Sequence, residues 1–490
     1  MLTEPATIRW NPIETKAGVS KSVTKMQEIY SERMNASEKR ASVSLALIYT
    51  VRMLGLFMIL PVFALYAGQL EGATYALMGF AVGVYGLTQS VFQIPFGMAS
   101  DRWGRKPVIT VGLVIFAVGS VMAAVSTDIW GVIIGRAVQG AGAVAAVVMA
   151  LNADLTREEH RAKAMATIGA SIGLSFAVAL VLGPVLDGWI GVNGIFWLIG
   201  GLALVSIAIL WGVVPNPAVQ RRHRDATPVL SLLMPVLRDV ELQRLNVGIF
   251  TLHLALTAVF IAVPTILFRE LGVAKEAHWE IYLPVMAISM LAMVPFIVVA
   301  EKRRKMKPAL LGGVAVLAIA QLLLVDSRSL WAFGASLVVF FTAFNLLEAS
   351  LPSLVAKISP PESKGTAMGI YQTCQFLGAF VGGSVGGALT GAYGPRVVFL
   401  FIGLALVAWL ILAFGMRNPR YLNGLAFTVG PVSELEAPHL VNLLTGVTGV
   451  AEAVIIPDEG AAYLRVDNHA LDRLRLNQLR DGGWRVEISR

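Results

Sequence analysis

Three ionisable side chains lie inside long apolar stretches of this sequence, and their types suit proton exchange. Arg52 lies about nine residues into the first stretch, His253 about nine into the seventh, and Glu348 about eight from the end of the tenth. At 1.5 Å per helical residue, the three share a depth of roughly 12–14 Å from one membrane surface. Because ionisable groups are costly inside a bilayer, each is a functional candidate. The pattern predicts a proton-binding site centred on Glu348.

The same residues allow a structural interpretation. Arg52 and Glu348 would then form a static buried ion pair, and His253 would simply pack between helices. Other polar residues in the second and eleventh stretches are candidates to line a cavity: Gln89, Gln93, Tyr371, Gln372 and Gln375.

A short charged loop separates the second and third apolar stretches and contains Gly97, Asp101, Arg102, Gly104, Arg105 and Lys106. Taken alone, such a loop is a solvated topology anchor. Asp154 ends the fourth stretch at the same face, so Asp101, Arg105 and Asp154 are expected to pair. Their carboxylates would favour a helix N-terminus, for which the sequence at 363–366 is the candidate.

Two further groups sit within apolar stretches. Arg136 lies in the fourth stretch with Gln139 and Gly140, and it needs acceptors from neighbouring helices or from water in a cavity. Small residues in the fifth and eleventh stretches are expected to let helices pack closely. They are Gly169, Gly173, Gly183 and Gly188 in the fifth, and Gly378, Gly382, Gly383, Gly386, Gly387 and Gly391 in the eleventh. In the fifth stretch Pro184 permits a bend, and Asp187 precedes Gly188.

The elements that position these residues are predicted as twelve membrane helices. The chain of 490 residues is 56% hydrophobic and 14% charged, with a mean hydropathy of +0.71. Its apolar blocks are long enough to cross a hydrocarbon core of roughly 30 Å. We expect spans at 43–67, 74–97, 107–126, 130–154, 162–186, 193–214, 244–268, 279–300, 308–325, 330–356, 364–391 and 395–416.

The basic residues behind the net charge of +8 are concentrated in the loops between the apolar stretches. Seventeen lysines and arginines fall in the loops on one side and four in those on the other, which predicts both termini in the cytoplasm. This placement argues against nucleic acid. Cys374 is the single cysteine, which excludes internal disulfides and thiolate metal clusters.

The chain divides into a tail (1–42), a six-span half (43–214), a linker (215–243), a second six-span half (244–417) and a soluble domain (421–490). The halves echo each other, since Asp101, Arg102 and Arg105 align at an offset of 200 with Glu301, Lys302 and Lys305. The soluble domain is predicted to be β-α-β-β-α-β, a ferredoxin-like α+β fold. Its strands are expected at 421–429, 451–456, 461–466 and 484–488, and its helices at 433–445 and 468–480.

These motifs resemble the drug:proton antiporter branch of the major facilitator superfamily, with its twelve spans. The 97–106 loop, Arg136-x-x-Gln139-Gly140 and Gly183-Pro184-x-x-Asp187-Gly188 look like family motifs in the right order, although Asp187 stands where glycine is usual. Arg52 to Gly55, residues 345–354 and the appended domain resemble the YajR-type transporters. The resemblance implies that Asp101, Arg105 and Asp154 latch the two halves in the outward-open state, and that export is driven by proton entry.

We therefore expect a proton-coupled inner-membrane exporter of small amphipathic compounds, working by alternating access and driven by the proton gradient without a cofactor or metal. It would be a monomer in the bilayer and not an enzyme. Glu348, Arg52 and His253 would couple the proton. The alternatives are a proton-coupled metabolite importer and a membrane sensor that signals through the C-terminal domain.

Overall fold

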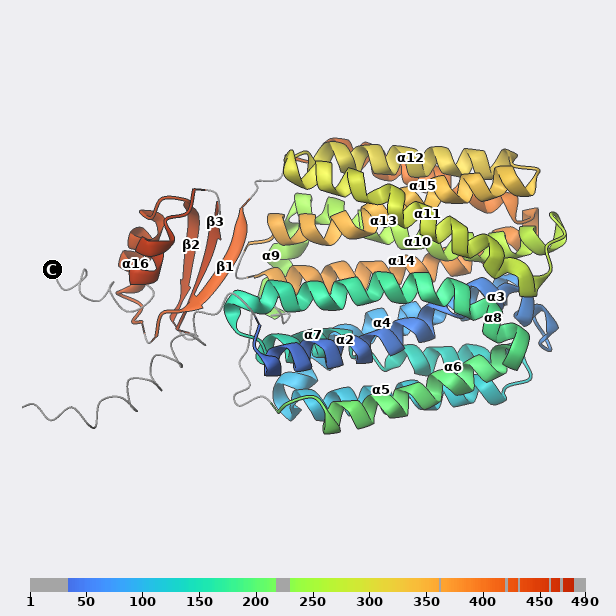
Figure 1. Cartoon of the computed structure of the whole chain (residues 1–490), viewed down its shortest axis with the longest axis horizontal. Coiled ribbons are helices and arrows are strands. Elements are labelled where there is room, and N and C mark those ends of the chain that lie inside the picture. Colours follow the sequence, from blue (N-terminus) through green and yellow to red (C-terminus); the bar gives the residue numbers. More distant parts are fainter. Residues whose placement is uncertain are drawn as a thin grey trace, which may run out of the picture.

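The computed structural model describes residues 34–216, 230–360, 363–418, 422–430, 432–457, 460–467 and 470–479. Most of it is a bundle of long helices lying side by side, with a small sheet at one end (Figure 1). We call the end of the bundle beside the sheet the domain end and the opposite one the far end. In the described residues, eleven helices are long and apolar enough to cross a membrane.

The first half holds five such stretches. They comprise α2 (Ala36–Phe57) with α3 (Leu60–Tyr66), α4 (Tyr75–Trp103), α5 (Arg105–Val125), α6 (Ile129–Ala141) with α7 (Ala145–Asp154), and α8 (Glu158–Gly212). The first helix begins seven residues before the predicted span because Asn35 caps it, accepting from the backbone N–H of Glu38 at 2.8 Å. The predicted tail therefore ends earlier, and residues 1–33 lie outside the described part.

The predicted fifth and sixth spans are two helices that meet at Gly191 without a loop and share the label α8, which explains eleven stretches where twelve were expected. Gly191 has φ 68° and ψ 171°, so the helix turns sharply there. A glycine adopts this left-handed region without steric cost, and the chain folds back on itself after it. The bundle thus retains twelve membrane passes.

Two other spans are broken. Pro61 lies in the first turn of α3, just after the break that separates α3 from α2. The fourth span is interrupted between α6 and α7 at residues 142–144. The second break follows shortly after Gln139, a buried polar residue of α6.

The second half holds six helices after a linker that contains η2 (Leu230–Leu232) and α9 (Leu233–Arg238). They are α10 (Val240–Arg269), α11 (His278–Lys302) after η3 (Lys275–Ala277), α12 (Met306–Asp326), α13 (Leu330–Ile358), α14 (Lys364–Tyr393) and α15 (Arg396–Phe414). The predicted spans match these helices within a few residues.

Apolar side chains lie on the outer surface of the bundle as well as in its core. On α5, Val111, Val114 and Val118 are 54%, 44% and 49% exposed, and they follow a helical spacing on the outer face. Trp189 near the far end is 79% exposed and Trp103 at the domain end 68%. Amphipathic indole rings are typical of the two membrane interfaces. The outer surface therefore suits lipid.

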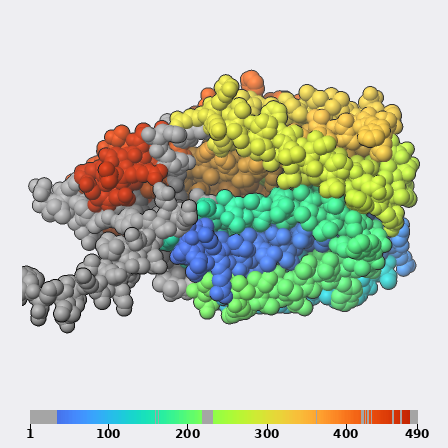
Figure 2. Space-filling view, in the orientation of Figure 1, coloured from blue at the N-terminus to red at the C-terminus, as the bar shows by residue number. Residues whose placement is uncertain are grey.

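The two halves touch most closely at the far end. There α4 and α14 pack backbone against backbone, since a Cβ on Gly79 would lie 2.1 Å from the carbonyl oxygen of Gly383. Figure 2 shows α8 and α11 together at the far end and apart toward the domain end, where α13 is visible in the recess between them. Gly169 and Gly173 of α8, which were expected to pack against another helix, have no neighbour within 4 Å of a Cβ in the described residues.

The C-terminal domain is a three-stranded antiparallel sheet in the order β1-β3-β2 with helices beside it. Its elements are β1 (Asn423–Thr428), α16 (Ala437–Thr445), β2 (Val450–Ile456), β3 (Ala461–Val466) and α17 (Arg473–Gln478). Strand β3 splits the β1-α16-β2 unit, which is the arrangement of a ferredoxin-like fold. The second helix is shorter than predicted, and the predicted strand at 484–488 lies outside the described residues.

Candidate functional site

An imidazole and a carboxyl group from different helices face each other inside the bundle. Nδ1 of His253 on α10 lies 3.8 Å from Oε2 of Glu348 on α13. Gln375 of α14 joins them, because its Nε2 lies 2.7 Å from Nε2 of His253 and 3.4 Å from Oε1 of Glu348. The side chains of His253 and Glu348 are 8% and 29% exposed. The structure thus brings together two of the three predicted proton-coupling residues, with Gln375 between them.

Arg52 of α2 has other partners. Its Nη2 donates to Oε1 of Gln89 at 2.7 Å and to the hydroxyl of Tyr85 at 3.1 Å. Its guanidinium carbon lies 5.7 Å from the centre of the Phe116 ring. Throughout the described chain, no ion pair joins Arg52 to Glu348. The static pair considered from the sequence is therefore not the arrangement in this conformation.

The predicted cavity glutamines form a hydrogen-bonded chain between the halves. Gln89 donates to Gln93 at 2.9 Å, and Gln93 donates across the seam to Gln372 of α14 at 2.6 Å. Gln89 and Gln93 are fully buried, and Gln372 is 8% exposed. Tyr371 beside them is also buried. This chain links Arg52 in the first half to the same helix that carries Gln375.

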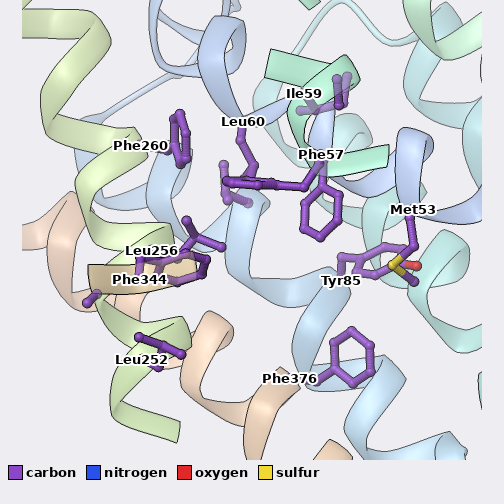
Figure 3. Close-up of a cluster of buried hydrophobic side chains, with 14 of the residues drawn as sticks. Met53, Phe57, Ile59, Leu60, Tyr85, Leu252, Leu256, Phe260, Phe344 and Phe376 are labelled. Carbon is purple, nitrogen blue, oxygen red and sulfur yellow. The ribbon is translucent and has the colours of Figure 1, made fainter. Parts of the chain in front are cut away.

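Aromatic side chains close the interior between this polar group and the far end. The ring of Phe176 on α8 packs edge-on to Phe57 of α2 with centroids 5.0 Å apart, and it lies 6.0 Å from Phe344 and 6.3 Å from Phe260 in the second half. Figure 3 shows Phe57, Phe260 and Phe344 among the buried side chains of this cluster. The ring of Phe344 also lies 6.2 Å from that of His253. Aromatic side chains therefore border the His253–Glu348–Gln375 group on the side of the far end.

Arg136 on α6 is completely buried and has local partners. Its Nη1 donates to Oε1 of Gln139 at 2.6 Å, and Gln139 in turn donates to Ser120 at 2.8 Å. The guanidinium carbon lies 4.8 Å above the ring of Tyr85, a cation–π contact. Gly140 lets α6 approach α4, since a Cβ there would lie 2.3 Å from the Tyr85 carbonyl oxygen. The predicted fourth-span residues thus form one cluster.

The charged loop at the domain end holds the predicted trio together. Arg105 donates through Nε to Asp154 at 3.0 Å and through Nη1 to Asp101 at 2.5 Å. Gly104, with φ 98°, makes the turn between α4 and α5 that an L side chain would strain. Lys106 donates to the Val214 carbonyl at 2.6 Å. Gly97 is buried on α4, whereas Arg102 is exposed.

The second half contains a reduced form of the same arrangement. Glu301 of α11, the counterpart of Asp101, pairs with Lys357 of α13 at 2.7 Å. Helix α14 begins at Lys364 as predicted, with Ser363 as its N-cap residue. The sequence echo therefore corresponds to an ion pair at the same end of each half.

At the far end, the fifth-span motif makes contact with the other half. Asp187 of α8 lies 3.6 Å from Nζ of Lys275. Gly183 allows α8 to approach the carbonyl of Met58 at the break of the first span. Pro184 lies within α8 without ending it, and Gly188 faces Glu276.

Two ion pairs join residues that the sequence alone does not connect. Arg157 binds Glu38 with a Nε–Oε1 distance of 2.9 Å, joining the start of α2 to that of α8. Lys275 of η3 pairs with Asp187 of α8. Both pairs join residues more than 80 positions apart, so neither spacing nor composition could match them. A carboxylate where the motif favours glycine was the one available hint for Asp187.

The fold and the interior polar group together define a membrane transporter with two six-helix halves. Residues 45–383 and 307–441 match the sequence profile of the Major Facilitator Superfamily, and the chain belongs to this family. It is 44% identical over 447 residues to the inner membrane transport protein YajR of Escherichia coli, covering 91% of this chain and 98% of that protein. It is also 25% identical over 379 residues to the multidrug resistance protein MdtH of Aeromonas salmonicida, covering 75% and 93% of the two chains.

Solved structures agree on the fold. A bacterial homologue of the human lysosomal transporter Spinster, in an inward-facing and occupied conformation, superposes with a TM-score of 0.67 at 15% identity. The match covers 78% of this chain and 97% of that one.

Proposed function

We propose that this transporter is a proton-coupled exporter of small amphipathic compounds, with Glu348 as the residue that takes up and releases the proton. The observation that carries the proposal is the His253–Glu348–Gln375 group inside the bundle. Oε2 of Glu348 and Nδ1 of His253 are buried without a hydrogen-bond partner among the described residues. A carboxyl group without a bound cation accepts a proton without first breaking an ion pair.

The surroundings support an amphipathic substrate. The aromatic cluster of Phe57, Phe176, Phe260 and Phe344 offers apolar contact area beside polar groups, which is the usual composition of small-molecule sites. The similarity to a multidrug resistance protein favours export over import.

The distribution of basic residues supports an orientation with the domain end in the cytoplasm. Arg105, Lys106, Arg157, Arg304 and Lys357 all lie at that end. The recess between α8 and α11 would then open to the cytoplasm, from which a substrate for export must enter.

The charged loop would set which side is open. Arg105 holds Asp101 and Asp154 together at the domain end of the first half. In the outward-open state this cluster would hold the domain end closed. Protonation of Glu348 and closure of the loop are thus separate steps of one cycle.

The test begins with a sensitivity screen in a strain that lacks its other exporters, which identifies a transported compound. Purified protein in proteoliposomes is then given a pH gradient. We expect Glu348→Gln to abolish proton-driven transport, whereas the exposed Glu280→Gln control retains it. Full proton-driven transport by Glu348→Gln would contradict the coupling assignment. Substrate movement with the proton rather than against it would indicate an importer.

A further inference from the structure

Gln375 contacts both members of the buried pair through a single atom. Its Nε2 lies 2.7 Å from Nε2 of His253 and 3.4 Å from Oε1 of Glu348. An amide nitrogen carries two hydrogens and donates only, so each partner must accept. With the amide of Gln375 in this orientation, Nε2 of His253 is the unprotonated ring nitrogen.

This contact fixes the location of the imidazole proton. In a neutral ring one nitrogen donates and the other accepts, so the proton of His253 must lie on Nδ1. Nδ1 faces Oε2 of Glu348 at 3.8 Å, which is longer than a hydrogen bond.

The amide also controls protonation of the ring. The imidazolium form needs a proton on Nε2, which collides with the amide hydrogens of Gln375. The ring accepts that proton only if the amide turns over and presents Oε1, which removes the hydrogen bond from Gln375 to Glu348. Protonation of His253 at Nε2 and the hydrogen bond from Gln375 to Glu348 therefore exclude each other.

We propose that Gln375 is a positioning residue that holds His253 neutral as its Nδ1–H tautomer and so directs the transported proton to Glu348. The statement that this proton is the transported one rests on the proposed function, whereas the tautomer of His253 does not. The proton reaches Glu348 from the water on one side of the membrane and leaves to the water on the other. Only the O–H bond of the Glu348 carboxyl forms and breaks in the protein.

The other ionisable groups near the pair do not take over this role. Tyr49 of α2 and Tyr371 of α14 are buried, and within the described residues neither forms a hydrogen bond with Glu348 or His253. Arg52 directs its Nη2 to Gln89 and Tyr85. Among the described residues, Gln375 alone forms hydrogen bonds with both His253 and Glu348.

The experiment measures the tautomer directly. Full-length protein labelled with ¹⁵N-histidine is placed in lipid nanodiscs, and the ring-nitrogen resonances of His253 are identified by their loss in His253→Gln. The chain has six histidines, so one subtraction suffices. We expect an unprotonated Nε2 and a protonated Nδ1 at neutral pH, with the ring still neutral under mildly acidic conditions.

Two variants at Gln375 are expected to change the tautomer of His253, and one matched control is expected to leave it unchanged. Gln375→Met keeps the side-chain length without donors, so we expect the unprotonated Nε2 resonance to be lost. Gln375→Glu presents acceptors only when it is ionised, so we expect Nε2 to become the protonated nitrogen at a pH where this carboxyl is charged. Gln372→Met, one turn earlier on α14, removes the bridge to Gln93 and should leave the His253 resonances unchanged.

The outcomes separate the two proposals. A wild-type His253 with a protonated Nε2, or an unchanged tautomer in both Gln375 variants, overturns the inference. The readout requires no transport, so it stands or falls independently of Glu348→Gln in proteoliposomes. In the transport assay, Gln375→Met should change the pH profile, whereas Gln372→Met should change the rate at every pH alike.

Discussion

Asp187 in the first half and Lys275 in the second form an ion pair across the far end, with Oδ2 and Nζ 3.6 Å apart. Asp187 is 9% exposed and Lys275 39%, so the pair lies at the edge of the bundle. It is joined by a cation–π contact between Arg269 and the ring of Tyr75, 5.7 Å apart. The far end is thus closed by charge as well as by packing.

Asp187→Asn should favour opening of the far end. A partly exposed ion pair contributes roughly 0.2–1 kcal/mol, so we expect the open population to rise by a factor of about 1.4 to 5. Spin labels at Trp189 and Leu283, in a Cys374→Ser background, measure the separation of the halves. High salt should reduce the difference between variant and parent, because salt screens exposed charges. An unchanged distance distribution would show that packing alone closes this end.

Arg105→Lys should destabilise the protein. Arg105 donates in different directions to Asp101, Asp154 and Ser100, which an ammonium group cannot reproduce with the same geometry. Arg105→Ala should cost more, about 3 kcal/mol, because it removes a buried guanidinium from two carboxylates. Thermal unfolding in detergent measures both. Arg102→Ala is the control, since Arg102 is exposed, and a loss as large as that of Arg105→Ala would contradict this assignment.

Gly83→Ala should disrupt the seam between the halves. A Cβ at this position would lie 2.6 Å from the carbonyl oxygen of Phe380, so the two helix backbones must separate. Overpacking of this kind costs about 1–3 kcal/mol. Gly173→Ala is the matched control, because a Cβ there meets no described atom within 4 Å. Equal melting temperatures for the two variants would be incompatible with a tight seam.

Arg465→Ala should loosen the C-terminal domain from the bundle. Arg465 of β3 donates to the carbonyl of Lys357 at the end of α13, and Arg304 pairs nearby with Asp467 at 3.5 Å. Pulsed EPR distances between labels on α16 and α13 should broaden in Arg465→Ala and stay narrow in the exposed control Arg473→Ala. Identical distributions in the two variants would assign the docking to other contacts.

The sequence predicted most of the membrane fold because lipid imposes a simple rule on composition. Long apolar blocks with basic loops must become helices, so the spans were found within a few residues. The breaks near Pro61 and at residues 142–144 were harder to predict, since they depend on which helices lie beside them. Gly191 illustrates the same limit. The sequence contains many glycines, and only the three-dimensional structure shows that the chain reverses direction at this one with a positive φ.

The interior site was predicted in part for a physical reason. Burial cost identified Arg52, His253 and Glu348 one residue at a time, but their partners depend on helix rotation. Arg52 consequently faces Gln89 rather than Glu348, and the glutamines form a bridge. The role of Gln375 needed atomic contacts, because polar side chains in a membrane helix look alike in a sequence.

The glycine seam between α4 and α14 has a mechanical consequence. Where backbones touch directly, there are few interlocking side chains to withdraw and few rotamers to reset when one half tilts against the other. Close backbone contact at Gly79, Gly83, Gly383 and Gly387 therefore leaves few side chains that would oppose a tilt of one half against the other. If the proposed cycle of alternating access holds, the ion pair between α8 and η3 would break and re-form as the far end opens and closes.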